Sequence, residues 1–91
     1  MLKLIWRDSA RDDARGIFRY IAERNPAAAE RLLAVIEACA EGLTDHPYMY
    51  RPGRVAGTRE AVVHPNYIIV YRVTAEAVEI VSVVHARQEY P

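Results

Sequence analysis

The chain ends in SVVHARQEYP, where polar side chains follow a β-branched run. Histidine can act as a general acid or base near neutral pH, and arginine holds phosphate well. His85, Arg87 and Tyr90 could therefore form a reactive site together with Arg59, which lies in an earlier segment. The alternative is that His85 caps the end of a strand and Arg87 pairs with Glu89 or the terminal carboxylate.

A second group of candidate residues lies in the segment DHPYMYRPGRVAG. Two prolines and two glycines interrupt it, which predicts a loop. Long loops in small domains are usually functional or mobile. Tyr48, Arg51 and Arg54 on this loop are therefore candidate binding residues.

Charge and composition narrow the function classes. Twelve cations balance twelve anions, so any site for nucleic acid must be a local basic patch. Cys39 is the single cysteine, and no Cys/His spacing suits a metal, so we expect no disulfide, metal or cofactor. No apolar run reaches transmembrane length and no signal peptide leads the chain, which predicts a cytoplasmic protein without a membrane partner.

The first half of the chain predicts one strand and two helices. Residues 2–6, LKLIW, form a short apolar strand. Ser9 and Asp12 fit a capping box that would begin the first helix. Asn25 fits the cap of the second helix, which is expected to end near Gly42. The short connection between the two helices predicts a hairpin.

The second half predicts three strands, TREAVV, YIIVYRV and AVEIVSVVH, joined by hairpin turns. The whole order predicts a single α+β domain over residues 1–91. Its expected architecture is a strand, an α-helical hairpin and a three-stranded antiparallel meander. This gives a four-stranded sheet with two helices packed on one face.

Alternation along the strands predicts which residues share a face. If neither turn contains a bulge, Arg59, Tyr71 and Glu79 form one row across three strands, with Tyr67 and His85 further along the same face. We expect this face to be the exposed binding surface. The helices should then cover the opposite face, which carries Val62, Ile68, Val70, Ile80 and Val84.

Two alternatives remain open for this row. A bulge at either turn would reverse the faces of a strand. The row could also be a cross-strand ion pair that only stabilises the sheet, at about 0.2–1 kcal/mol. Because such exposed pairs contribute so little, replacing Arg59 or Tyr71 by alanine is expected to leave folding largely intact and to reduce toxicity or antitoxin affinity. Outright unfolding would instead favour a purely structural role.

The motifs GTREAVVHPNYIIVYRV and VEIVSVVHARQEYP resemble the C-terminal half of the RelE/ParE superfamily of bacterial toxins. The segment GIFRYIAERNPAAAERL resembles the helical hairpin of its ParE-like branch. The resemblance implies a toxin that is encoded beside an antitoxin and neutralised by it. The resemblance also implies that the pair represses its own operon, with operator DNA contacted only through the antitoxin. We expect the antitoxin to dock as a helix plus an extended stretch.

The superfamily contains ribosome-dependent mRNA endonucleases and poisons of DNA gyrase. The first RelE-like cation falls on Arg59, but others fall on Ala61, on Ile68 and near Ala86, with Arg87 one place off. Each missing phosphate-holding group would cost about 3–4 kcal/mol of transition-state stabilisation. The resemblance therefore implies a ParE-like growth inhibitor acting on gyrase. The alternatives are an mRNA endonuclease on the ribosome and a non-toxic remnant that binds antitoxin.

Overall fold

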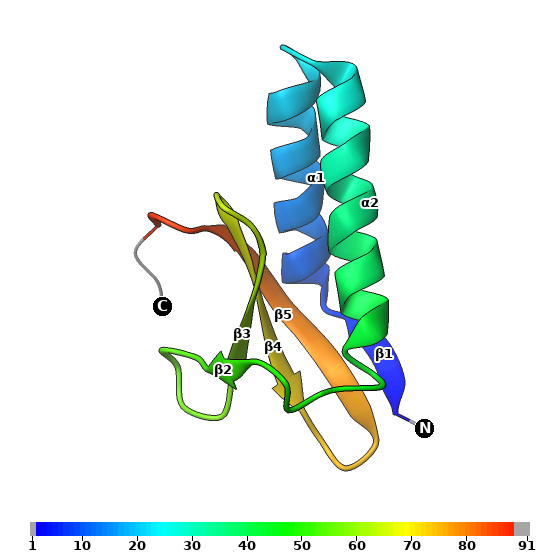
Figure 1. Cartoon of the computed structure of the whole chain (residues 1–91), viewed down its shortest axis with the longest axis vertical. Coiled ribbons are helices and arrows are strands. Elements are labelled where there is room, and N and C mark those ends of the chain that lie inside the picture. The colour runs from blue at the N-terminus through cyan, green and yellow to red at the C-terminus, as the bar shows by residue number, and fades with distance from the viewer. Residues whose placement is uncertain (1, 89–91) are drawn as a thin grey trace.

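The computed structural model describes residues 2–88 and contains a mixed sheet with two helices on one face (Figure 1). The elements are β1 (Lys3–Trp6), α1 (Asp8–Ala22), α2 (Pro26–Gly42), β2 (Arg51–Pro52), β3 (Arg59–His64), β4 (Tyr67–Val73) and β5 (Ala77–His85). The strand order is β1-β5-β4-β3-β2, with β1 parallel to β5 and the other pairs antiparallel. The α+β class and the helical hairpin on one face are confirmed. The sheet has five strands instead of four, because β2 forms inside the predicted loop.

The two helices begin in different ways. The Asn25 side chain accepts a hydrogen bond from the Ala28 amide at 3.1 Å, so the expected cap of α2 is confirmed. The capping box expected for α1 is wrong, because α1 has no side-chain cap. The Ser9 hydroxyl instead donates to the Val81 carbonyl at 2.8 Å, which ties the first turn of α1 to β5.

Two irregularities change the expected strand register. Between β3 and β4, Arg59 lies opposite Tyr71 as expected, but a shift near the turn places His64 opposite Tyr67. Between β4 and β5, a second shift places Tyr71 opposite Ile80. The expected row of Arg59, Tyr71 and Glu79 is therefore broken at its third member.

The assignment of the two sheet faces is wrong except for Ile80, which packs in the main core as expected. The face that carries Ala61, Ile69 and Tyr71 packs into the main core with the helices, and all three side chains are 0% exposed. Ile68, Val70 and Val84 form a smaller cluster on the other face. Every residue of β4 from Tyr67 to Tyr71 is buried, so alternation in this strand could not identify the helix side.

The helical hairpin extends beyond the end of the sheet in Figure 1, while the β2 region lies at the opposite end of the strands. Within residues 2–88, no helix is long and apolar enough to cross a membrane. The fold thus offers two regions for a site. One lies around β2 and the other lies where the hairpin overhangs the sheet.

Candidate functional site

The loop before β2 is fixed to the sheet at two carbonyl groups. The buried Tyr71 hydroxyl donates to the Pro47 carbonyl at 2.7 Å. The Arg59 guanidinium donates to the Tyr50 carbonyl at 2.6 Å. The residues between these anchors, Tyr48 and Met49, are 67% and 64% exposed. The sheet therefore presents an aromatic and a thioether side chain to solvent on a fixed backbone.

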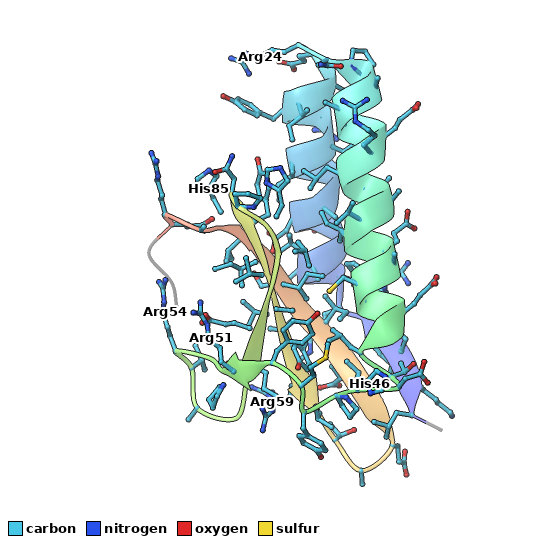
Figure 2. The ribbon with its side chains drawn as sticks, viewed as in Figure 1. Arg24, His46, Arg51, Arg54, Arg59 and His85 are labelled. Carbon is cyan, nitrogen blue, oxygen red and sulfur yellow. The ribbon has the colours of Figure 1, made fainter. Side chains whose placement is uncertain are left out.

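Arg59 has a second role at this loop. Its guanidinium carbon lies 5.0 Å from the centre of the Tyr48 ring, a cation–π contact that orients the ring. Figure 2 shows Arg51, Arg54 and Arg59 around the same part of the molecule. We call this surface the loop platform and define it as Tyr48, Met49, Arg51, Arg54 and Arg59.

A buried carboxylate organises the platform. Glu60 is 3% exposed and accepts a hydrogen bond from the Arg51 guanidinium at 3.1 Å. Its second oxygen accepts from the backbone amide of Arg54, also at 3.1 Å. Glu60 was not among the binding residues predicted from the sequence. The available signal was an acidic residue inside the otherwise apolar strand segment EAVV, where burial requires a paired charge.

Two glycines shape the turn from β2 to β3. The Gly53 amide donates to the Thr58 carbonyl at 2.8 Å, and a Cβ at position 53 would collide with the Thr58 hydroxyl. Gly57 has a φ of +83°, a conformation that strongly favours glycine. The turn that carries Arg54 is thus specified by local geometry. The Arg54 side chain also donates to the Gln88 carbonyl at 3.4 Å, which connects the platform to the chain after β5.

Burial perturbs three ionisable groups beneath the platform. It raises the pKa of Tyr71, and the neighbouring Arg59 charge opposes part of that rise. Burial also raises the pKa of Tyr50, and the adjacent Cys39 raises it further. The pKa of the Cys39 thiol is raised by burial as well. All three groups are therefore neutral near pH 7 and act as packing and hydrogen-bonding groups.

The structure separates the predicted binding residues into three places. Tyr48, Arg51, Arg54 and Arg59 meet at the loop platform. Tyr71 lies beneath it, fully buried. The expected exposure of Tyr71 is therefore wrong.

The other two predicted binding residues lie elsewhere. Glu79 pairs with Arg7 at 3.3 Å, beside the β1 edge of the sheet. Tyr67 faces the overhanging hairpin, where it lines a groove together with His64 and His85. The Tyr67 ring lies 5.8 Å from the His64 ring and 5.4 Å from the His85 ring, measured between centroids.

His85 and Arg59, two of the four catalytic candidates, lie apart in the structure. His85 lies opposite Tyr67 and Arg59 lies opposite Tyr71, four residues further along β4. At about 3.3 Å per residue this separates them by roughly 13 Å along the strand. Figure 2 shows His85 near one end of the sheet and Arg59 near the other.

The contacts of His85 fit the alternative interpretation, in which it caps the end of a strand. Its Nδ1 atom accepts a hydrogen bond from the Arg87 amide at 3.1 Å, just beyond the end of β5. The proposed partner Glu89 and the candidate Tyr90 lie outside the described residues. Within residues 2–88, no group of three or more His, Cys, Asp or Glu side chains could hold a metal ion.

Comparisons with known proteins give a consistent result. Residues 4–90 match the family described as ParE toxin of type II toxin-antitoxin system, parDE. Putative toxin Y4kP of Sinorhizobium fredii is 42% identical over 73 residues, which cover 79% of this chain and 75% of that protein. Toxin RelE2 of Caulobacter vibrioides is 35% identical over 88 residues, which cover 94% and 97%. A solved structure of the chromosomal ParDE TA system from P. aeruginosa has a TM-score of 0.83 at 20% identity, over 93% of this chain and 96% of that chain.

Proposed function

Because the chain belongs to the ParE toxin family of type II toxin–antitoxin systems, we propose that it inhibits growth by acting on DNA gyrase. The resemblance drawn from the sequence motifs is confirmed by the family match and by the two toxin relatives. The matching family is named for ParE, but one of the two relatives is named RelE2, so the choice of target rests on the residues of this chain.

The observation that carries the choice is the burial of the positions where RelE-like toxins hold phosphate. Ala61 is 0% exposed under the helices, and Ile68 is 3% exposed on the opposite face. Ala86 packs against the same small apolar cluster as Ile68. Phosphoryl chemistry needs cations aimed at the developing charge. Apolar side chains at these positions support a toxin that acts without cleaving RNA.

The loop platform is the surface that we assign to target binding. Tyrosine and arginine are enriched among residues that dominate binding energy, and methionine is enriched in interface cores. Tyr48 and Met49 are exposed although the backbone around them is fixed by Tyr71 and Arg59. A fixed backbone lowers the entropy cost of association. The three platform arginines favour a partner surface with negative charge.

A cognate antitoxin encoded beside this gene is the second partner. It neutralises the toxin, and operator DNA is contacted through the antitoxin. The platform and the groove offer two surfaces for these two partners, and they adjoin where Arg54 of the platform bonds to Gln88 of the groove.

The target is tested by expression from a tightly controlled promoter with two readouts. We expect a DNA damage response with filamentation and with translation still running at the onset of arrest. Rapid loss of translation with cleaved mRNA would instead identify the ribosome as the target. Absence of any growth defect, together with binding of the antitoxin in solution, would support the non-toxic remnant.

The nuclease alternative is tested by primer extension on a translated mRNA with ribosomes and purified toxin. Wild type, His85→Ala and Tyr90→Phe are compared. We expect no cleavage from any of the three, because Ala61 and Ile68 stand where cations would hold the phosphate. Codon-positioned cuts by wild type that disappear in His85→Ala would overturn the gyrase proposal. A general acid or base typically contributes about 10²–10⁴ in rate, so the loss would be plain.

A further inference from the structure

A groove of about 800 Å³ lies between α1 and the strand ends that carry the two histidines. Its apolar lining comes from α1, α2 and the sheet, and includes Ile17, Ile21, Leu32, Tyr67 and Val83. Its polar lining includes Asp12, Asp13, His64, His85 and Gln88. An apolar floor with a polar rim is the arrangement that receives an amphipathic helix.

Gly16 lines this groove from the middle of α1. Glycine inside a helix costs about 0.5–1 kcal/mol relative to alanine. A Cβ at position 16 would meet no atom within 4 Å, so nothing in the described chain requires glycine there. Gly53 and Gly57 differ, because a collision and a positive φ respectively explain them. The missing side chain at Gly16 leaves the backbone of α1 bare at the groove surface.

The groove also has a charge bias that the whole chain lacks. Its lining contains two aspartates and no lysine or arginine, although the net charge of the chain is zero. Asp12 pairs at 3.5 Å with Arg15, which lies outside the lining, so the charge bias of the groove comes from Asp13. Asp13 accepts hydrogen bonds from the Ser82 hydroxyl at 2.9 Å and from the Val83 amide at 3.0 Å, both through Oδ2. These bonds fix the carboxylate in place. Its Oδ1 atom takes no hydrogen bond from any residue between 2 and 88.

We propose that Gly16 determines which antitoxin this toxin accepts, by allowing an antitoxin helix to pack directly on the backbone of α1. In this arrangement a lysine or arginine of that helix pairs with Asp13, while its apolar residues contact the groove floor. The inference rests on the antitoxin partner of the proposed function, but it is independent of the identity of the toxin's target. A bare helix backbone permits a close approach that any larger side chain prevents.

The test fills the groove without harming the fold. Gly16→Leu places a good helix former at an open position, so the thermal midpoint should stay equal to wild type or rise. Isothermal titration calorimetry is performed with the product of the small open reading frame adjacent to the toxin gene. We expect the affinity for this protein to fall by at least roughly tenfold, because hot-spot contacts carry energies of that size. Toxicity should persist and should no longer be relieved by co-expression of the antitoxin.

The matched control is Gly42→Leu. Gly42 also lies in a helix with no atom within 4 Å of an added Cβ, but it does not line the groove. This variant should bind antitoxin as wild type does. Asp13→Asn keeps an acceptor for Ser82 and Val83 but removes the charge, so the salt dependence of binding should weaken.

Two results would overturn the proposal. One is equal antitoxin affinity for wild type, Gly16→Leu and Gly42→Leu. The other is loss of toxicity in Gly16→Leu with antitoxin affinity unchanged, which would assign the groove to the target. A ribosomal target leaves both measurements intact, and a protein without toxicity leaves the affinity measurement, which is read without reference to the target.

Discussion

Tyr71 connects the core to the loop platform. Two replacements of this residue separate the contribution of its buried ring from that of its hydroxyl group. The side chain is 0% exposed and is the largest of the fully buried side chains. Truncation of a large aromatic residue in a core typically costs about 3–5 kcal/mol, because it removes apolar contacts and leaves a cavity. A domain of this length is stabilised by about 5–14 kcal/mol in total. Tyr71→Ala should therefore remove a large share of the free energy of unfolding.

Tyr71→Phe isolates the hydroxyl group. The ring stays in the core, and only the hydrogen bond to the Pro47 carbonyl is lost. Pro47 is half-buried, so water can reach its carbonyl in the variant. We expect a cost near the lower end of about 1–3 kcal/mol. The loop should loosen while the core stays packed. We therefore expect a clear loss of toxicity together with only a small loss in the free energy of unfolding.

The assay is urea unfolding at pH 7, followed by circular dichroism, with Tyr48→Ala as the control. Tyr48 is exposed, and its removal should change the free energy of unfolding by less than about 0.5 kcal/mol. A change below about 1 kcal/mol for Tyr71→Ala would contradict the observed assignment of sheet faces. It would instead favour the exposed row that alternation predicted.

Two further outcomes follow from the buried groups beneath the platform. Burial raises the folded-state pKa of Tyr50 and of Tyr71 above the unfolded value near 10, so the stability that the neutral phenols contribute is complete below pH 10 and is lost as the pH rises above it. Urea unfolding between pH 8 and 11 should show this loss, which should be smaller in Tyr71→Phe, and a free energy of unfolding that does not change with pH would refute it. Glu60→Gln should lower the free energy of unfolding by about 1–3 kcal/mol, because the Arg51 side chain and the Arg54 amide lose their charged acceptor. Thermal melts measure this loss, with Glu79→Gln as a control at an exposed ion pair, and equal melting temperatures for the two variants would count against a structural role of Glu60.

The sequence was sufficient for the two helices and the four longer strands but insufficient for the faces of the sheet. The cap at Asn25 and the short turn signals located α2 and the strands of the meander. Face assignment relied on strict alternation, and one extra residue in a strand reverses every side chain beyond it. The shift between Val70 and Tyr71 thus removed Glu79 from the expected row. Turn lengths alone gave no sign of this shift.

A second limit comes from apolar residues on both sides of the sheet. β4 is buried on both faces, so Ile68 and Ile69 looked equally suited to contact the helices. What distinguishes the faces is tertiary: Ser9 and Asp13 of α1 bond to β5. Such pairings join residues about seventy positions apart and leave no local pattern. For the same reason β2, which has only two residues, was invisible inside a loop.

The arrangement along β4 constrains how the antitoxin can neutralise the toxin. Tyr67 faces the groove at one end of the strand, and Tyr71 supports the loop platform at the other. These residues are four positions apart, or roughly 13 Å along an extended strand. A helix confined to the groove would leave the platform open to the target. Neutralisation through the groove therefore requires either a change in the platform or a further antitoxin segment of about four extended residues that reaches it. The expected helix followed by an extended stretch meets this requirement, and truncation of the stretch should preserve binding while restoring toxicity.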